Sequence, residues 1–178
     1  RTSAYMLHHI LEANGGLPER CVVSFQNTGR EMPQTLDFVQ ECGSRWGVNI
    51  VWLEYRGDKP WFERVSHNSA SRDGEPFEAL IRKRKYLPNQ QARFCTIELK
   101  IRTAKRYLMT LGWKEWANAI GIRADEQRRI RPENDKMKDR WFTWQPLNHA
   151  NVTRHMVIEW WRRKSFDLRL DAVNGNSA

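Results

Sequence analysis

The sequence predicts an α/β domain built on a parallel sheet, and two apolar stretches carry most of that prediction. The β-branched run Cys21–Phe25 has the length of a strand and leads through a polar turn into a helix that begins near Pro33. A second apolar run, Ile50–Tyr55, follows that helix. Strand, helix and strand in this order predict a right-handed crossover between two parallel strands.

Further elements are expected on both sides of this unit. An apolar stripe followed by two glycines predicts a helix over Thr2–Asn14. Periodicity and turn residues predict helices over Phe77–Tyr86 and Thr96–Leu111, and a last helix after a cap at Thr153. A third buried strand is predicted over Trp116–Ile122. The apolar repeat that begins at Ile97 is expected to face the core. Residues 1–170 are predicted to form one domain, and the polar tail over 171–178 to be disordered.

Composition narrows the class of protein. A chain of 178 residues with 40% hydrophobic residues is globular and long enough for a real core. Thirty Lys and Arg against 21 Asp and Glu leave a net charge of +9, which favours an anionic partner, either a nucleic acid or a phosphorylated small molecule. The alternative is a basic, solvated surface.

Two further patterns concern the compartment. No apolar stretch approaches the roughly 20 residues that span a bilayer, and no secretory signal is visible, so no membrane partner is expected. The three cysteines, Cys21, Cys42 and Cys95, lack C-x-x-C spacing, which favours a reducing cytoplasm over a disulfide framework.

The segment Arg1-Thr2-Ser3 opens the first expected helix. Free N–H groups and the helix dipole make such an end a natural anion site, to which the hydroxyls can add hydrogen bonds. The alternative is ordinary capping by Thr2 or Ser3.

A second candidate site follows the strand at Cys21–Phe25. In open α/β sheets, ligands bind beyond the carboxyl ends of the strands. Asn27-Thr28-Gly29 and Glu31 stand there and offer an amide, a hydroxyl and exposed backbone for nucleotide recognition. The alternative is a turn followed by an acid that complements the helix dipole.

Cys95 lies near the expected start of a helix, with Arg93 and Lys100 close in sequence. Such an environment lowers the pKa of a thiol and favours thiolate chemistry or metal ligation. The alternative is a small buried hydrophobe. Because no second cysteine lies nearby in sequence, a complete metal or cluster site is hard to build from this chain.

Arginines gather in several places. Arg123 and Arg128 follow Gly121 at the end of the third strand and could clamp phosphate oxygens, or they could belong to a solvated cluster of Arg and Glu. The basic runs Arg82–Lys85 and Arg162–Lys164 suit either nucleic-acid contact or a solvated helix face. The pair His8-His9 lacks the i, i+4 spacing of a helical metal pair, and we interpret both as structural.

Together these segments resemble the phosphoadenosine phosphosulfate reductase family, a branch of the adenine nucleotide alpha hydrolases, also called N-type ATP pyrophosphatases. The short prophage-type members are the most similar. Four blocks match in order. The first is the end of the S-G-G-x-[TD]-S loop at Arg1-Thr2-Ser3, and the second is N-T-G-x-E…T-L-x-F at Phe25–Glu31 with Thr35–Phe38. The third is C-T-x-x-L-K at Phe94–Thr96 with Leu99-Lys100, the fourth is G-I-R-x-D-E at Ile120–Glu126, and a weaker fifth similarity is W-x-P-L at Trp144–Leu147. The match covers most of the chain.

The resemblance implies a fold and an activity. The fold is a parallel, twisted sheet of about five strands flanked by helices, the Rossmann-like nucleotide alpha hydrolase fold. The activity is adenylation-type sulfur transfer with release of pyrophosphate, or reduction of a sulfonucleotide, on ATP or phosphoadenosine phosphosulfate. Mg²⁺ and, in a longer native chain, an iron–sulfur cluster are the implied cofactors. The resemblance implies an adenine nucleotide as the partner, and sulfur transfer would add a sulfur donor protein. The basic charge adds a nucleic acid as a candidate substrate that accepts the sulfur.

The resemblance also assigns roles to single residues. The implied nucleotide-binding residues are Arg1, Thr2, Ser3, Asn27, Thr28, Gly29, Glu31, Gly121 and Arg128. The implied catalytic residues are Cys95, Lys100, Arg123 and Glu126. In this scheme Cys95 is the reacting thiol or a cluster ligand, and Lys100 neutralises charge. Glu126, with Glu31, positions metal or substrate.

Two departures from the family pattern affect these expectations. The first strand of the family and the S-G-G of its loop would precede Arg1, so we expect the first strand to be missing from this chain and the native protein to be longer. Many family members carry a C-x-x-C motif shortly after the position that matches the last residue of this sequence, and with Cys95 it could form a cluster site. That motif is absent from this sequence too, which puts cluster binding and reductase activity in question. The alternatives are a basic nucleic-acid-binding module and a catalytically degenerate scaffold on the same fold.

Overall fold

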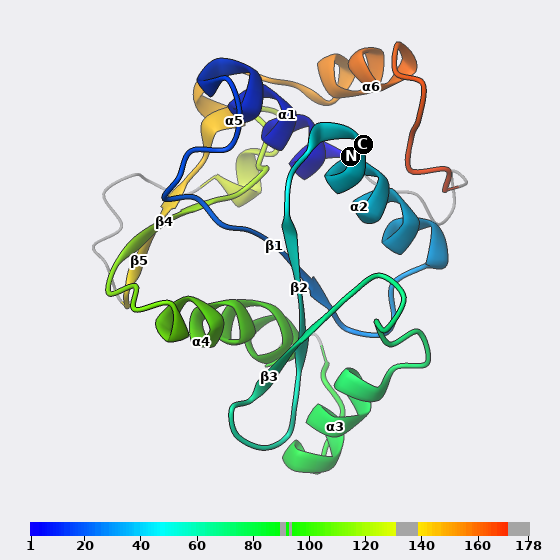
Figure 1. The fold of residues 1–178 in the computed structure, drawn as a ribbon, viewed down its shortest axis with the longest axis vertical. Helices are drawn as coiled ribbons and strands as arrows, with labels where there is room; N and C mark the ends of the chain where they lie inside the picture. The colour runs from blue at the N-terminus through cyan, green and yellow to red at the C-terminus, as the bar shows by residue number, and fades with distance from the viewer. Residues whose placement is uncertain (90–91, 93, 131–138, 171–178) are drawn as a thin grey trace. The chain divides into compact units, whose positions relative to one another are not determined.

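The computed structural model describes residues 1–89, 92, 94–130 and 139–170, and the predicted disordered tail over 171–178 lies outside them. The chain divides into two compact units, and Figure 1 labels their helices and strands. Unit 1 comprises Arg1–Arg20 and Lys114–Ala178, and unit 2 comprises Cys21–Trp113. The single domain expected over 1–170 stays a prediction, and each unit is described by itself.

Unit 2 contains a three-stranded sheet in the order β1-β2-β3. Strand β1 (Val23–Asn27) pairs in parallel with β2 (Ile50–Tyr55), and helix α2 (Pro33–Trp46) connects them. Strand β3 (Phe62–Val65) is antiparallel to β2. The predicted unit of two parallel strands joined by a helix is therefore confirmed, with Pro33 in the first turn of the helix, where its missing N–H costs nothing.

Strand β2 is buried on both faces, because its side chains alternate between two layers of helices. On one face Val51 and Leu53 pack with Tyr107, which belongs to α4 (Thr103–Thr110). On the other face Trp52 packs with Leu36 of α2. The mixed α/β class predicted from the sequence is confirmed in this unit.

The helical region after Cys95 differs from the prediction. It consists of a π-helical segment, η1 (Thr96–Arg102), that continues into α4, and Thr96 provides no side-chain cap. The wider turns of a π-helix shift the inward face along the sequence. Leu99 and Tyr107 are buried, whereas Ile97, which was expected to face the core, is 47% exposed. The periodicity therefore gave the wrong face over the π-helical segment, whereas Leu108 of α4 packs against the core as expected.

Helix α3 (Glu75–Arg84) completes unit 2. Its buried Leu80 packs with Tyr55 of β2 and with Phe94 and Leu99 of the following segment. Its last turn is basic, as the run that begins at Arg82 predicted, and this turn is exposed.

Unit 1 is a mixed α/β arrangement around a short parallel pair of strands. Strand β4 (Trp116–Ala119) pairs with β5 (Trp141–Trp144), and the rings of Trp116 and Trp141 stack with their centroids 5.7 Å apart. The helical elements are α1 (Thr2–Asn14), the single 3₁₀ turn η2 (Gln127–Arg129), α5 (Pro146–His149) and α6 (Arg154–Arg162). The predicted bounds of α1 are confirmed, and Gly15 ends it in the left-handed conformation (φ 65°).

Strand β4 is shorter than the predicted Trp116–Ile122. Its ladder contact ends at Ile120, whose N–H donates to the carbonyl of Trp144 at 3.0 Å. The N–H of Ile122 then donates back to the carbonyl of Ile120 at 2.9 Å, so the backbone turns away from the sheet. This turn places Gly121 and Arg123 beyond the carboxyl end of β4.

The described strands form one three-stranded and one two-stranded sheet, and a single five-stranded sheet is not shown. None of the helices in the described ranges is long and apolar enough to cross a membrane.

Candidate functional site

A polar cavity of about 250 Å³ lies in unit 1, where the start of α1 meets the turn after β4. Its lining is Arg1, Thr2, Ser3, Gly121, Arg123, Glu126 and Arg129. Six of these seven residues belong to the predicted site. The cavity therefore joins the first and the fourth motif blocks, which are more than a hundred residues apart in the sequence.

The start of α1 contributes hydroxyls and backbone donors rather than a cap. The N-cap residue is Arg1, and it makes no side-chain hydrogen bond to the helix. The Oγ1 atom of Thr2 instead accepts a hydrogen bond from Nη1 of Arg123 at 3.2 Å. The first N–H groups of any helix lack an acceptor within the helix. The alternative of ordinary capping by Thr2 is therefore not what the structure shows.

Gly121 permits the two blocks to approach closely. A Cβ atom at this position would lie 3.2 Å from both the backbone nitrogen and Oγ of Ser3. That separation is tighter than ordinary van der Waals contact, so a larger residue would push the two segments apart.

Arg123 is the best-fixed cation of the cavity. Its side chain is 9% exposed, and its Nε donates to Oδ1 of Asp125 at 2.9 Å. Nη1 lies 3.7 Å from Oε2 of Glu126 in addition to its contact with Thr2. A partly buried guanidinium with two carboxylate neighbours keeps one orientation, which suits recognition of an oxyanion.

Asp125 and Glu126 are both held in the ionised state. Burial raises the pKa of Asp125, but the hydrogen bonds from the Arg154 N–H and from Arg123 outweigh it, and the net pKa is lowered. Burial likewise raises the pKa of Glu126, whereas the Arg123 N–H and Arg129 lower it by more. Arg129, which pairs with Glu126, was not among the predicted site residues.

Arg129, and not the predicted Arg128, lines the cavity. Arg128 is exposed on η2. Sequence spacing could have indicated Arg129 rather than Arg128, because Arg129 stands three residues after Glu126 and their side chains meet on one turn. Arg1 is fixed from outside the cavity, since its guanidinium forms a two-point contact with Asp167.

The second motif block lies in unit 2, and Asn27 is its fully buried residue. Nδ2 of Asn27 donates to Oε1 of Glu54 at 2.7 Å and to the carbonyl of Ser71 at 2.8 Å. Oδ1 of Asn27 accepts from the N–H of Gly29 at 3.0 Å. The amide of Asn27 is thus engaged with the protein on both its nitrogen and its oxygen.

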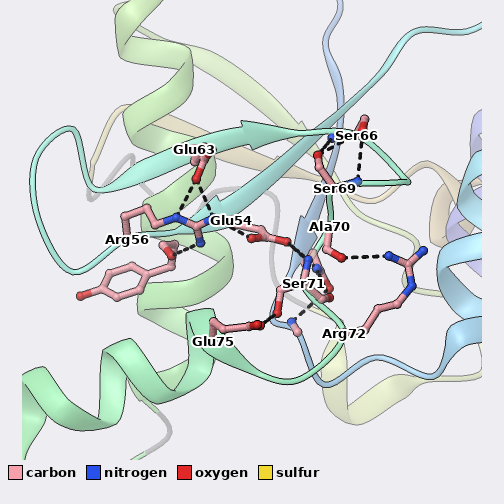
Figure 2. A network of polar contacts seen from close by, with 12 residues as sticks. Glu54, Arg56, Glu63, Ser66, Ser69, Ala70, Ser71, Arg72 and Glu75 are labelled. Atoms are coloured by element: carbon pink, nitrogen blue, oxygen red, sulfur yellow. Dashed lines mark hydrogen bonds and ion pairs between the residues drawn. The ribbon is translucent and has the colours of Figure 1, made fainter.

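Glu54 organises this region and was not predicted from the sequence. Its carboxylate is 1% exposed, and Oε1 also accepts from the N–H of Ser71 at 2.7 Å. Oε2 accepts from Arg56, which continues to Glu63 (Figure 2). A signal was available, because a charged residue stands inside the apolar run of β2 and lies opposite Asn27 in the parallel register.

The remaining residues of the block close a tight turn. Oε2 of Glu31 accepts from the N–H and Oγ1 of Thr28 at 2.9 and 2.8 Å. Gly29 has φ +76°, and a Cβ there would lie 2.6 Å from Oγ of Ser71. Nζ of Lys100 lies 3.5 Å from Oε1 of Glu31, so the second and third motif blocks meet at this ion pair.

Cys95 packs as a small apolar side chain. It is half-buried against the cluster that contains Phe94 and Leu99. Among the described residues one group of three side chains has the geometry to bind a metal, His8, His9 and Glu12, and Cys95 is not part of it. Arg93, the second cation expected near Cys95, lies outside the described residues.

Comparisons with known proteins give one relative and no family. No protein-family model matches the chain, and no solved structure matches it. The chain is 27% identical, over 186 residues, to the uncharacterized nin region protein ORF290 of Escherichia phage lambda. The alignment covers 99% of this chain and spans 61% of the length of that phage protein. Similarity to a phage protein agrees with the expected prophage-type origin.

Proposed function

We propose that the cavity in unit 1 binds the phosphates of an adenine nucleotide. The observation that carries this proposal is the contact between Arg123 and Thr2, because it joins two motif blocks in one polar cavity. Three guanidinium groups and one carboxylate line the cavity, in addition to two hydroxyls and the first N–H groups of α1. The guanidinium, hydroxyl and N–H groups are the donors that phosphate oxygens require, whereas the carboxylate of Glu126 is an acceptor.

The activity that suits this site is nucleotide chemistry of the phosphoadenosine phosphosulfate reductase type. It comprises ATP pyrophosphatase-type sulfur transfer or sulfonucleotide reduction on a Rossmann-like sheet of five strands. Arg123 donates to the phosphate oxygens, where negative charge develops as the phosphoanhydride breaks. Thr2 and Ser3 orient the same group. Glu126 fixes the backbone of Arg123 by accepting its N–H at 3.1 Å.

The implied cofactors fit this chain unequally. Mg²⁺ binds proteins through one or two carboxylates together with substrate phosphates, and the ionised Glu126 at the cavity supplies one such carboxylate. An iron–sulfur cluster usually needs four thiolates. The chain has three cysteines, and burial raises the pKa of Cys42 to about 12, which keeps that thiol protonated. The cysteines of this chain therefore do not fit an iron–sulfur cluster.

The test is calorimetric titration with ATP and Mg²⁺ and, separately, with phosphoadenosine phosphosulfate. Arg123→Gln removes the charge but keeps a hydrogen-bonding side chain, and we expect affinity to fall by about 30-fold or more. Arg162→Gln, an exposed residue of α6 outside the cavity, is the matched control and should bind as the unmodified chain does. Equal affinity in both variants would refute the proposal, and the preferred nucleotide separates sulfur transfer from reduction.

A second candidate function, nucleic-acid binding, is favoured by the location of the charge. Residues 75–113 contain nine Lys and Arg against three Glu, so they carry +6 of the net +9. In this region the buried Glu98 orients Arg84, Arg102 and Arg106. A steep loss of RNA or DNA affinity with added salt is expected, and Arg102→Gln should reduce the salt slope more than Arg163→Gln. Salt-independent or undetectable binding would exclude this function.

A further inference from the structure

Two adjacent histidines and a glutamate on α1 form a compact donor set that the nucleotide site does not use. Nδ1 of His8 and Nδ1 of His9 each lie 3.2 Å from the same oxygen, Oε2 of Glu12. One ligand atom from each of the three residues lies within 4.8 Å of the other two. From these contacts we infer that His8, His9 and Glu12 bind a divalent transition-metal ion of the zinc class.

The distances suit a tetrahedral ion. Zinc binds imidazole nitrogen and carboxylate oxygen at about 2.0–2.2 Å, so neighbouring ligand atoms of a tetrahedral site lie roughly 3.3–3.5 Å apart. Both nitrogen-to-oxygen distances, at 3.2 Å, are close to that edge. Two imidazoles and one carboxylate leave a fourth position for water, which is the ligand count of open zinc sites.

The surroundings fix the two imidazole rings. The ring of Trp160 on α6 lies against both histidines, with centroids 4.8 Å from His8 and 5.8 Å from His9. The ring of Tyr5 packs on His9 at 4.3 Å. Side chains that are already oriented by packing lose little conformational freedom when an ion binds.

One nitrogen of the donor set makes no hydrogen bond to the protein. Nε2 of His9 is buried and has no hydrogen-bond partner among the described residues. A buried polar atom in a folded protein rarely stays without a partner.

The separation of the three residues along α1 explains why the sequence did not predict this site. The pair His8-His9 does not have the i, i+4 separation of two helical ligands. Glu12, however, is four residues from His8 and three from His9, and residues at these separations share a helix face. The relevant pattern was therefore histidine to glutamate and not histidine to histidine.

The test is titration of the protein with Zn²⁺ by calorimetry and with Co²⁺ by visible absorption. All measurements use a Cys21→Ser background, because Cys21 is exposed and could bind zinc on its own. We expect one ion per chain and a four-coordinate Co²⁺ spectrum. His9→Gln and Glu12→Gln should each weaken binding by at least 10-fold, and Mg²⁺ should not compete.

The matched control is His155→Gln. His155 and Glu159 form another i, i+4 pair of histidine and glutamate on α6, but with one imidazole, 82% exposure and a distance of 3.9 Å. This variant should bind zinc as the background does. Circular dichroism checks that each variant is folded, and the exposed Glu12 allows its exchange without loss of packing. Undiminished binding in Glu12→Gln and His9→Gln, or absence of binding in the background, would overturn the inference. The zinc titrations contain no nucleotide, so their outcome is independent of the nucleotide-binding test.

Discussion

The two motif regions of the molecule use similar residue types for opposite purposes. In unit 1, Thr2, Ser3 and Arg123 line a polar cavity. In unit 2, Asn27 and Glu31 are occupied by bonds within the protein, to Glu54, Ser71, Gly29 and Thr28. The first arrangement offers donors to a ligand, and the second uses its donors and acceptors to shape a loop. Residues that match a family motif can therefore stabilise a loop of the protein as well as line a cavity.

The largest expected effect tests the scaffold side of this comparison. Asn27→Ala would leave Oε1 of Glu54, the carbonyl of Ser71 and the N–H of Gly29 without the bonds that they now make to Asn27. Oε1 of Glu54 would keep its bond from the N–H of Ser71, so two groups would lose their partner. Unsatisfied buried groups cost about 1–3 kcal/mol each, so the free energy of unfolding should fall by about 2–4 kcal/mol. Urea unfolding followed by circular dichroism measures it.

The control for this variant is Asn49→Ala, an exposed residue of the same unit. It should change the free energy of unfolding by less than about 0.5 kcal/mol. If the two variants were equally stable, the network around Glu54 would contribute nothing to unit 2, and the contrast between the units would collapse.

A smaller effect is expected on the ligand side. Arg123→Lys keeps the charge in the cavity but removes the planar fork that contacts both Thr2 and Asp125 and that we propose to contact a phosphate. Nucleotide affinity should fall by about 10-fold, which is about 1.4 kcal/mol. The melting temperature should change little. Calorimetry and thermal unfolding on one sample separate the two quantities, and a large loss of stability with unchanged affinity would assign Arg123 to the scaffold instead.

Local patterns predicted the parts of the fold that depend on local chemistry. The bounds of α1, α2 and β2 follow from apolar spacing, from Pro33 at a helix start and from Gly15 and Gly47 at helix ends. The helix after Cys95 was predicted on the wrong face, because nothing in a 3.6-residue period announces a π-helical turn. Within that segment Leu99 and the charged Glu98 are both buried, a pairing of adjacent residues that the apolar spacing does not indicate.

The site was predicted better than its supports. Six residues of the cavity were expected, since each belongs to a polar motif that lies at the start of a helix or after a strand. Glu54, Ser71 and Arg129 were not, because their importance comes from partners that are distant in sequence or one position away from a more conspicuous residue. Buried polar residues in apolar strands deserve the same weight as exposed motif residues.

The smallest expected effect concerns the ion pair between the second and third motif blocks. Lys100 is 48% exposed and its Nζ lies 3.5 Å from Glu31, so Lys100→Gln should change the free energy of unfolding by less than about 0.5 kcal/mol. Lys114→Gln, an exposed lysine of unit 1, is the matched control for lost charge. Urea unfolding at low and high salt measures both variants. A loss above about 1 kcal/mol that salt does not reduce would show that this pair acts as a buried one, and the turn around Glu31 would then depend on Lys100 as well as on Thr28.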